Sequence, residues 1–142
     1  MYLDTAILVK LVVRESDSSF YARLVDRQIA WSSQVAITEC FSALLRKERE
    51  TAISAAHRRA AWQQIEDDVA SGRLSLVPVD RRLLDRANAM LDRVHPAVAL
   101  RSLDAIHLAS ADESRSWPLC SNDARLRSAA TILGMPLTPL PP

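Results

Sequence analysis

The chain opens with Met1-Tyr2-Leu3-Asp4-Thr5-Ala6-Ile7-Leu8-Val9-Lys10-Leu11, in which an acid separates two apolar segments. Its first three residues predict a short buried strand that ends at Asp4, and residues 5–11 predict a short helix. A carboxylate that directly follows a buried strand is costly to remove from water, and we expect it to gain little from capping a short helix. Asp4 therefore predicts a functional site at the end of the first strand.

The rest of the chain repeats this alternation of short apolar segments and helices. Further strands are predicted over residues 29–32, 74–79 and 118–121. Helices are predicted over residues 16–26, 34–49, 54–71, 81–92, 102–113 and 124–133, with Ser16 or Asp17 and Ser102 as N-terminal caps and Gly72 and Gly134 as ends. The prolines of residues 135–140 allow an edge strand at most, and residues 94–100 are the expected exposed loop.

Strands of about four apolar residues separated by helices indicate an α/β fold. We expect a three-layer sandwich in which a mostly parallel sheet of four to five short strands is flanked by helices. The 142 residues fit a single domain spanning residues 1–142, because no repeat or linker interrupts them.

Composition limits the possible environments and cofactors. No segment approaches the roughly 18 uninterrupted apolar residues of a membrane span, so no membrane association is expected. Cys40 and Cys120 lie far apart in apolar surroundings, which fits reduced thiols in a cytoplasmic protein, and no paired Cys or His spacing indicates zinc. The net charge of +1 leaves nucleic-acid binding open, because 16 of the 18 basic residues are arginine, which binds phosphate bidentately.

Four acids lie near the predicted boundaries of strands and helices: Asp4, Glu39, Asp104 and Asp123. Ligands of parallel α/β sheets bind at the carboxyl ends of the strands, where these acids are expected to meet. Asp104 also has a structural interpretation in the first turn of a helix, as does Asp123 as an N-terminal cap. Converging carboxylates repel one another unless a cation offsets them, and an all-oxygen set suits Mg²⁺ or Mn²⁺. Such a site is typical of phosphodiester hydrolysis.

The same residues carry a family resemblance. The opening stretch resembles the first motif of PIN-domain ribonucleases, in particular the VapC toxins of bacterial and archaeal toxin–antitoxin pairs. The other motifs follow in the family's order: Thr38-Glu39-Cys40, then Leu100-Arg101-Ser102-Leu103-Asp104-Ala105-Ile106-His107-Leu108-Ala109, then Ser121-Asn122-Asp123-Ala124-Arg125-Leu126. The closing Leu133-Gly134-Met135-Pro136-Leu137 is also similar, so the resemblance covers essentially the whole chain.

The resemblance implies a PIN-like fold and a Mg²⁺- or Mn²⁺-dependent endoribonuclease. It implies that Asp4, Glu39, Asp104 and Asp123 are the catalytic metal site and that the hydroxyls of Thr5 and Ser121 orient carboxylates or water. It further implies an RNA substrate, a homodimer and a small VapB-like antitoxin that blocks the pocket. The sequence departs from the family at Ala6, where serine is common, and this removes a hydroxyl but no metal ligand.

Three other residues have two or more interpretations. His107 lies three residues after Asp104 and is either a general base or, as we favour, a packed helix histidine. Arg101 and Arg125 flank two of the acids and either contact RNA phosphate, accept antitoxin acids or are solvated surface residues.

Functions of other classes fit less well. A phosphoacceptor receiver domain needs a lysine at a late strand end, whereas Lys10 and Lys47 lie on predicted helices. A haloacid-dehalogenase-like phosphatase needs a second aspartate where Ala6 stands. The remaining alternative is a degenerate or non-toxin PIN domain that only binds RNA or protein, and the presence of all four acids argues against it.

Overall fold

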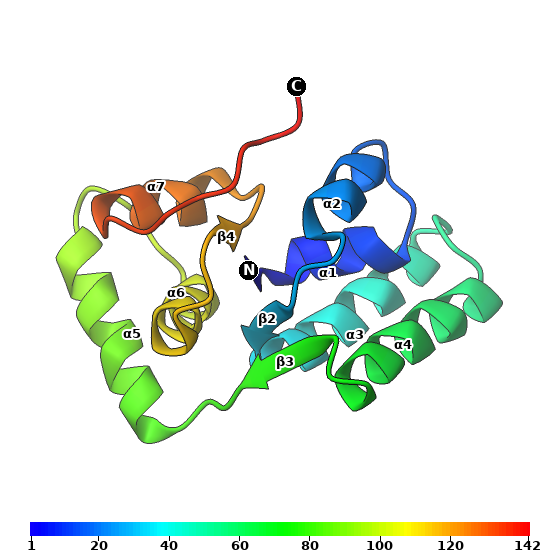
Figure 1. Ribbon diagram of the computed structural model, residues 1–142, viewed down its shortest axis with the longest axis horizontal. Coiled ribbons are helices and arrows are strands. Elements are labelled where there is room, and N and C mark those ends of the chain that lie inside the picture. Colours follow the sequence, from blue (N-terminus) through cyan, green and yellow to red (C-terminus); the bar gives the residue numbers. More distant parts are fainter.

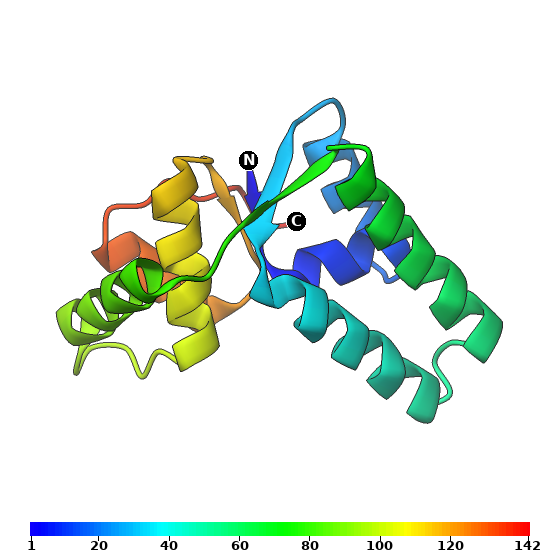
Figure 2. The same ribbon diagram turned by 90° about the horizontal axis from the view of Figure 1, so that it is seen from below.

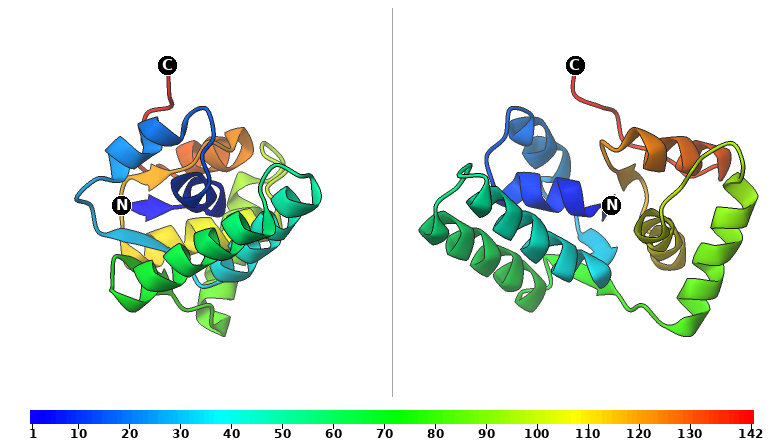
Figure 3. Two further views of the ribbon diagram at one scale, coloured as in Figure 1. Left: turned by 90° about the vertical axis from the view of Figure 1, so that its right-hand side faces the viewer. Right: turned by 180° about the vertical axis from the view of Figure 1, so that it is seen from behind.

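Four short parallel strands lie at the centre of the protein, whose computed structural model describes all 142 residues. They are β1 (Tyr2–Leu3), β2 (Ala30–Ser33), β3 (Leu74–Val77) and β4 (Leu119–Cys120). Their order across the sheet is β3-β2-β1-β4, and all neighbouring pairs are parallel (Figure 3, left). The predicted parallel sheet is confirmed, and β1 lies in its interior.

Helices cover both faces of the sheet. They are α1 (Thr5–Val12), α2 (Ser18–Val25), α3 (Val35–Arg49), α4 (Ala55–Ala70), α5 (Arg81–Val94), α6 (Ser102–Ser114) and α7 (Ala124–Ile132). The first four lie on one side of the sheet and the last three on the other (Figures 1 and 2). The predicted three-layer α/β sandwich is therefore confirmed.

The pleat of the strands divides the apolar side chains between two cores. Successive strand residues point to opposite faces, so Tyr2 packs among residues of α5, α6 and α7 while Leu3 packs against α1, α3 and α4. Leu119 and Cys120 divide in the same way. Because β1 is buried on both faces, Asp4, which directly follows it, also lies in the interior.

Several predicted details differ in the structure. Ser102 is not a cap: the extended residue before α6 is Arg101, with φ −85° and ψ 157°, and Ser102 is already helical. Asp17 precedes α2 but makes no capping bond, because its carboxylate pairs with Lys10. Val94 belongs to α5 and is buried, so the expected loop is confined to residues 95–100.

The prolines decide where two of the predicted strands end. The strand predicted over residues 74–79 stops at Val77, before Pro78. Residues 135–140 form no strand, and a single bridge joins Leu119 to Leu137. Proline has no N–H to donate to a ladder, which limits both segments.

The two cysteines behave as predicted from their apolar surroundings. Cys40 and Cys120 are free and buried, and burial raises the pKa of their thiols to about 12 and about 11. None of the helices combines the length and apolar character needed to cross a membrane.

Candidate functional site

The carboxyl ends of β1 and β4 meet at the point where the chain reverses its direction across the sheet. From β1 the chain proceeds to β2 and β3 on one side and then returns to β4 on the other. Ligands of open parallel sheets bind at such a switch point. The N–H of Asp4 donates to the carbonyl of Cys120 at 3.1 Å, so the residues that follow the two strands are adjacent.

Asp4 is a buried carboxylate with only 5% of its surface exposed. It does cap α1, contrary to the expectation that capping contributes little, because Oδ1 accepts from the N–H of Ile7 at 2.9 Å. Burial raises its pKa, an effect that Asp123 reinforces and that the Ser121 side chain and the Ile7 N–H only partly oppose. The cap therefore satisfies one oxygen but does not offset the buried charge.

Asp104 and Asp123 lie at the N-terminal ends of α6 and α7, on the other side of the sheet from α1. Asp104 lies in the first turn of α6, and its Oδ2 is buried without a hydrogen-bond partner. Burial and the charge of Asp123 raise its pKa. Asp123 caps α7 through Oδ1, which accepts from the N–H groups of Arg125 at 2.8 Å and Leu126 at 3.0 Å. The structural interpretation of Asp123 is thus confirmed, and its second oxygen remains available.

Glu39 enters the site from α3 and is held by two side chains. The Thr5 hydroxyl donates to Oε1 at 2.8 Å, and Nε2 of His107 lies 2.7 Å from the same oxygen. Burial alone would raise the pKa of Glu39, but the contacts with His107 and Thr5 lower it below its ordinary value. His107 is itself buried, and its Nδ1 lies 2.8 Å from the hydroxyl of Tyr2.

One pocket of about 780 Å³ collects these side chains. The predicted site residues that line it are Asp4, Thr5, Glu39, Arg101, Asp104 and Asp123, together with His107. Ser121 is fully buried and accepts from the N–H of Asp123 at 3.0 Å, while Arg125 is not part of the lining. The structure therefore brings all four acids to one pocket, and Arg125 is not among the residues that line it.

The donors in the pocket fit a hard divalent cation. Oδ2 of Asp104 is buried without a hydrogen-bond partner, and burial raises the pKa of Asp4, while carboxylate oxygen is the ligand that Mg²⁺ and Mn²⁺ prefer. No three His, Cys, Asp or Glu side chains are close enough to form a finished metal site, however.

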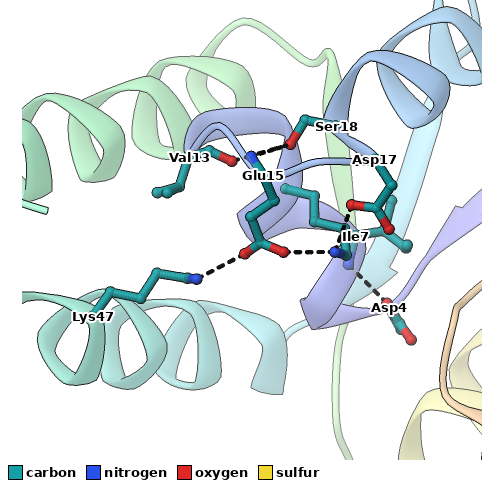
Figure 4. A network of polar contacts seen from close by, with 8 residues as sticks. Asp4, Ile7, Val13, Glu15, Asp17, Ser18 and Lys47 are labelled. Carbon is teal, nitrogen blue, oxygen red and sulfur yellow. Dashed lines mark hydrogen bonds and ion pairs between the residues drawn. The ribbon is translucent and has the colours of Figure 1, made fainter. Parts of the chain in front are cut away.

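Basic residues also line the pocket. Lys10 lies 2.6 Å from Glu15 and 2.7 Å from Asp17, and Lys47 lies 2.7 Å from the other oxygen of Glu15 (Figure 4). This ion-pair cluster joins α1, α3 and the connection between α1 and α2, and it neutralises both lysines. The cationic residues of the pocket that form no ion pair are Arg46, Arg49 and Arg101.

Tyr2 and two arginines near the end of α3 contribute to the site, although no local sequence pattern marks them. Tyr2 and His107 are 105 residues apart, so only the pairing of β1 beside α6 reveals their contact. Arg46 and Arg49 are three residues apart and share a helix face, but this spacing is common on solvated helices. Their placement in the pocket depends on how α3 crosses the sheet.

Comparison with known proteins decides the family. A model of the PIN domain matches residues 1–132. The chain is also 40% identical to Ribonuclease VapC46 of Mycobacterium tuberculosis, over 95% of this chain and 93% of that one. The chain is a PIN-domain ribonuclease of the VapC family. Ribonuclease VapC35 of the same species is 33% identical to this VapC-family chain, with the same coverage.

Solved structures agree with the fold of this VapC-family chain. Mycobacterium tuberculosis VapC20, described as a sarcin-ricin loop cleaving toxin, superposes with a TM-score of 0.71 at 18% identity, over 90% of this chain and 93% of that one. VapBC2 from Rickettsia felis, bound to a promoter DNA fragment, gives a TM-score of 0.65 at 13% identity over 96% of each chain. The PIN-like architecture predicted from the sequence is therefore confirmed.

Proposed function

We propose that this VapC-family nuclease is the toxin of a type II toxin–antitoxin pair. It would cut RNA phosphodiester bonds with Mg²⁺ or Mn²⁺ held by Asp4, Glu39, Asp104 and Asp123. The observation that carries the proposal is that these four acids, taken from four separate segments, line one pocket at the switch point of the sheet. Structural capping explains Asp4 and Asp123 singly, but it does not explain why Asp104 keeps a buried oxygen without a partner.

Each residue has a distinct part in this proposal. Asp4 and Asp104 are the principal ligands, since Asp4 is buried and Asp104 is half-buried with its Oδ2 left without a partner. Asp123 and Glu39 contribute charge from the pocket's edges, either directly or through water. When bound, the cation would polarise the phosphate and activate a water molecule. Thr5 orients Glu39 through its 2.8 Å hydrogen bond, and Ser121 braces Asp4 and the N–H of Asp123.

The unpaired arginines are the proposed contacts for the RNA backbone. Arg46, Arg49 and Arg101 line the same pocket as the acids and have no carboxylate partner, so they are available to bind phosphate. Arg125 lies outside the lining, and we assign it to the rim, where it would contact RNA or acidic residues of a VapB-like antitoxin. We also expect a homodimer, as the resemblance implies, and a cytoplasmic location, which the free buried cysteines support.

The test is cleavage of RNA by the purified protein with and without a divalent cation. We expect cleavage in Mg²⁺ or Mn²⁺, none in excess EDTA, and a loss of at least about 100-fold in Asp104→Asn. Asp80 provides a matched control for Asp123, because it also caps a helix through Oδ1, at 2.8 Å from the Leu83 N–H, but lies outside the pocket. Asp123→Asn should reduce cleavage while Asp80→Asn leaves it intact.

Two results would contradict the proposal. Cleavage that persists in EDTA would exclude the metal mechanism. Equal activity in Asp123→Asn and Asp80→Asn would show that Asp123 only caps α7. The toxin role is tested separately by expressing the chain in a bacterial host, where growth arrest should be relieved by the product of a short neighbouring gene.

A further inference from the structure

The side chain of His107 is held at both ring nitrogens by residues of different elements. Its Nδ1 lies 2.8 Å from the hydroxyl of Tyr2 on β1, and its Nε2 lies 2.7 Å from Oε1 of Glu39 on α3. The Tyr2 ring meets the imidazole edge to face, with centroids 6.0 Å apart. With 3% of its surface exposed, His107 has no freedom to turn without breaking one of these contacts.

The direction of the hydrogen bond to Glu39 follows from the chemistry of its acceptor. An ionised carboxylate only accepts hydrogen bonds, so Nε2 must carry a proton. The Thr5 hydroxyl donates to the same Oε1 and also lies 3.2 Å from Nε2. Oε1 therefore receives two donors, whereas Oε2 receives none from the chain.

We propose that His107 is a positioning residue that fixes Glu39 with Oε1 occupied and Oε2 reserved for the cation. The proposal rests on the proposed role of Glu39 as a metal ligand. Glu39 is the longest of the four acidic side chains. It enters the pocket from α3, which lies on the other side of the sheet from the helices that carry Asp104 and Asp123. Without a partner it would turn away from Asp4 and Asp104, because like charges repel. His107 and Thr5 prevent this before any cation binds.

This arrangement excludes two simpler roles for the imidazole. A histidine that only fills the core would satisfy its second nitrogen with a backbone carbonyl or with water, whereas His107 contacts an acid that lines the pocket. A general base would need an unprotonated nitrogen in the pocket. The ring nitrogen nearest to the pocket is Nε2, and it donates a hydrogen bond to Glu39. Hydrogen-bond partners of this kind orient metal-binding side chains in many proteins, and their loss weakens metal affinity about 10- to 100-fold.

The test compares two amides in place of the imidazole. Glutamine places an N–H near the position of Nε2 and can still donate to Glu39, whereas asparagine reaches only the position of Nδ1. Calorimetric titration with Mn²⁺ alone should show affinity within about 3-fold of wild type for His107→Gln, and about 10- to 100-fold weaker binding for His107→Asn. His57→Asn, an exposed histidine on α4, controls for the loss of an imidazole and should bind Mn²⁺ like wild type.

Folding and metal binding are separated by independent measurements. Melting temperatures in EDTA show whether a His107 variant folds. If His107→Asn does not fold, Tyr2→Phe replaces it in the test. Tyr2→Phe removes the hydroxyl that contacts Nδ1 and should also weaken Mn²⁺ binding. Nitrogen-15 NMR of the imidazole should show a proton on Nε2 in metal-free wild type. A proton on Nδ1 alone, or wild-type Mn²⁺ affinity in folded His107→Asn, would overturn the positioning role. Unchanged Mn²⁺ affinity in Glu39→Gln would instead overturn the role proposed for Glu39, and the inference with it.

Discussion

Replacing Asp4 by asparagine should stabilise the metal-free protein while abolishing cleavage. Asparagine is as good an N-terminal cap as aspartate, so the bond from the Ile7 N–H to the side chain is kept and only the buried charge is lost. A buried polar group without full compensation costs roughly 1–3 kcal/mol. Asp4→Asn should therefore raise the free energy of unfolding in EDTA at pH 7 by about that amount.

The magnitude converts directly into a melting temperature. At about 2.1 cal/mol/K of unfolding entropy per residue, a chain of this length shifts by roughly 3 °C for each kcal/mol, so the gain is about 3–10 °C. The pKa of Asp4 is raised in the folded state, so folding favours its protonated form. The destabilisation caused by the Asp4 charge is absent below the pKa that aspartate has in the unfolded chain, near pH 4. It grows as pH rises through the pKa of Asp4 in the folded state. The advantage of Asp4→Asn should therefore vanish in acid.

Scanning calorimetry between pH 4 and pH 8, in EDTA and in excess Mn²⁺, measures both effects. Mn²⁺ should stabilise wild type, because it binds the folded state alone, and should leave Asp4→Asn unchanged. Asp4→Ala is the control: it removes the charge and the cap together, and the lost cap costs about 1 kcal/mol. If Asp4→Asn melts below wild type in EDTA at pH 7, the Asp4 carboxylate contributes more to folding as an anion than its burial costs, contrary to this prediction.

Three further predictions concern other parts of the molecule. Glu15→Gln should lower the free energy of unfolding by about 1 kcal/mol at pH 7 in urea titrations, because Glu15 bridges two lysines. The difference should shrink as pH falls, since the folded pKa of Glu15 is lowered and its stabilisation is lost on protonation. The double variant Arg46→Glu/Arg49→Glu should bind RNA at least about 10-fold more weakly, with a flatter salt dependence, because both arginines line the pocket. Arg59→Glu, at an exposed position outside the pocket, should bind RNA like wild type. Filter binding at several salt concentrations measures both effects. Arg127→Met should cost about 1–3 kcal/mol and speed amide exchange at Leu137 and Thr138, because Arg127 donates to the carbonyls of Ser121 and Thr138.

The sequence was most informative where burial dictates the pattern. The two-residue β1 could be predicted because Tyr2 and Leu3 must be buried on opposite faces, and Asp4 stands out as the acid that follows them. The convergence of Asp4 and Asp123 followed from parallel strands that end side by side. These inferences need only local patterns and the rule that ligands bind at the carboxyl ends of such strands.

The sequence was least informative where the outcome depends on one particular contact or on the backbone conformation of one residue. Asp17 has the side chain of a helix cap, but its carboxylate pairs with Lys10 instead. Ser102 also has such a side chain, but the extended residue before α6 is Arg101. The packed position of His107 was predicted, but its bond to Glu39 depends on how α3 and α6 meet over β1. No local pattern shows that meeting.

We propose that the pocket holds a divalent cation on these carboxylates. Anomalous diffraction from crystals soaked in Mn²⁺, measured on wild type and Asp104→Asn, tests it most directly. We expect one strong peak in the pocket of wild type, with oxygens of Asp4 and Asp104 at about 2.0–2.2 Å and Glu39 or Asp123 as a ligand or one water away. The peak should be lost in Asp104→Asn. A wild-type pocket without a peak, or a peak bound by other residues, would contradict the account.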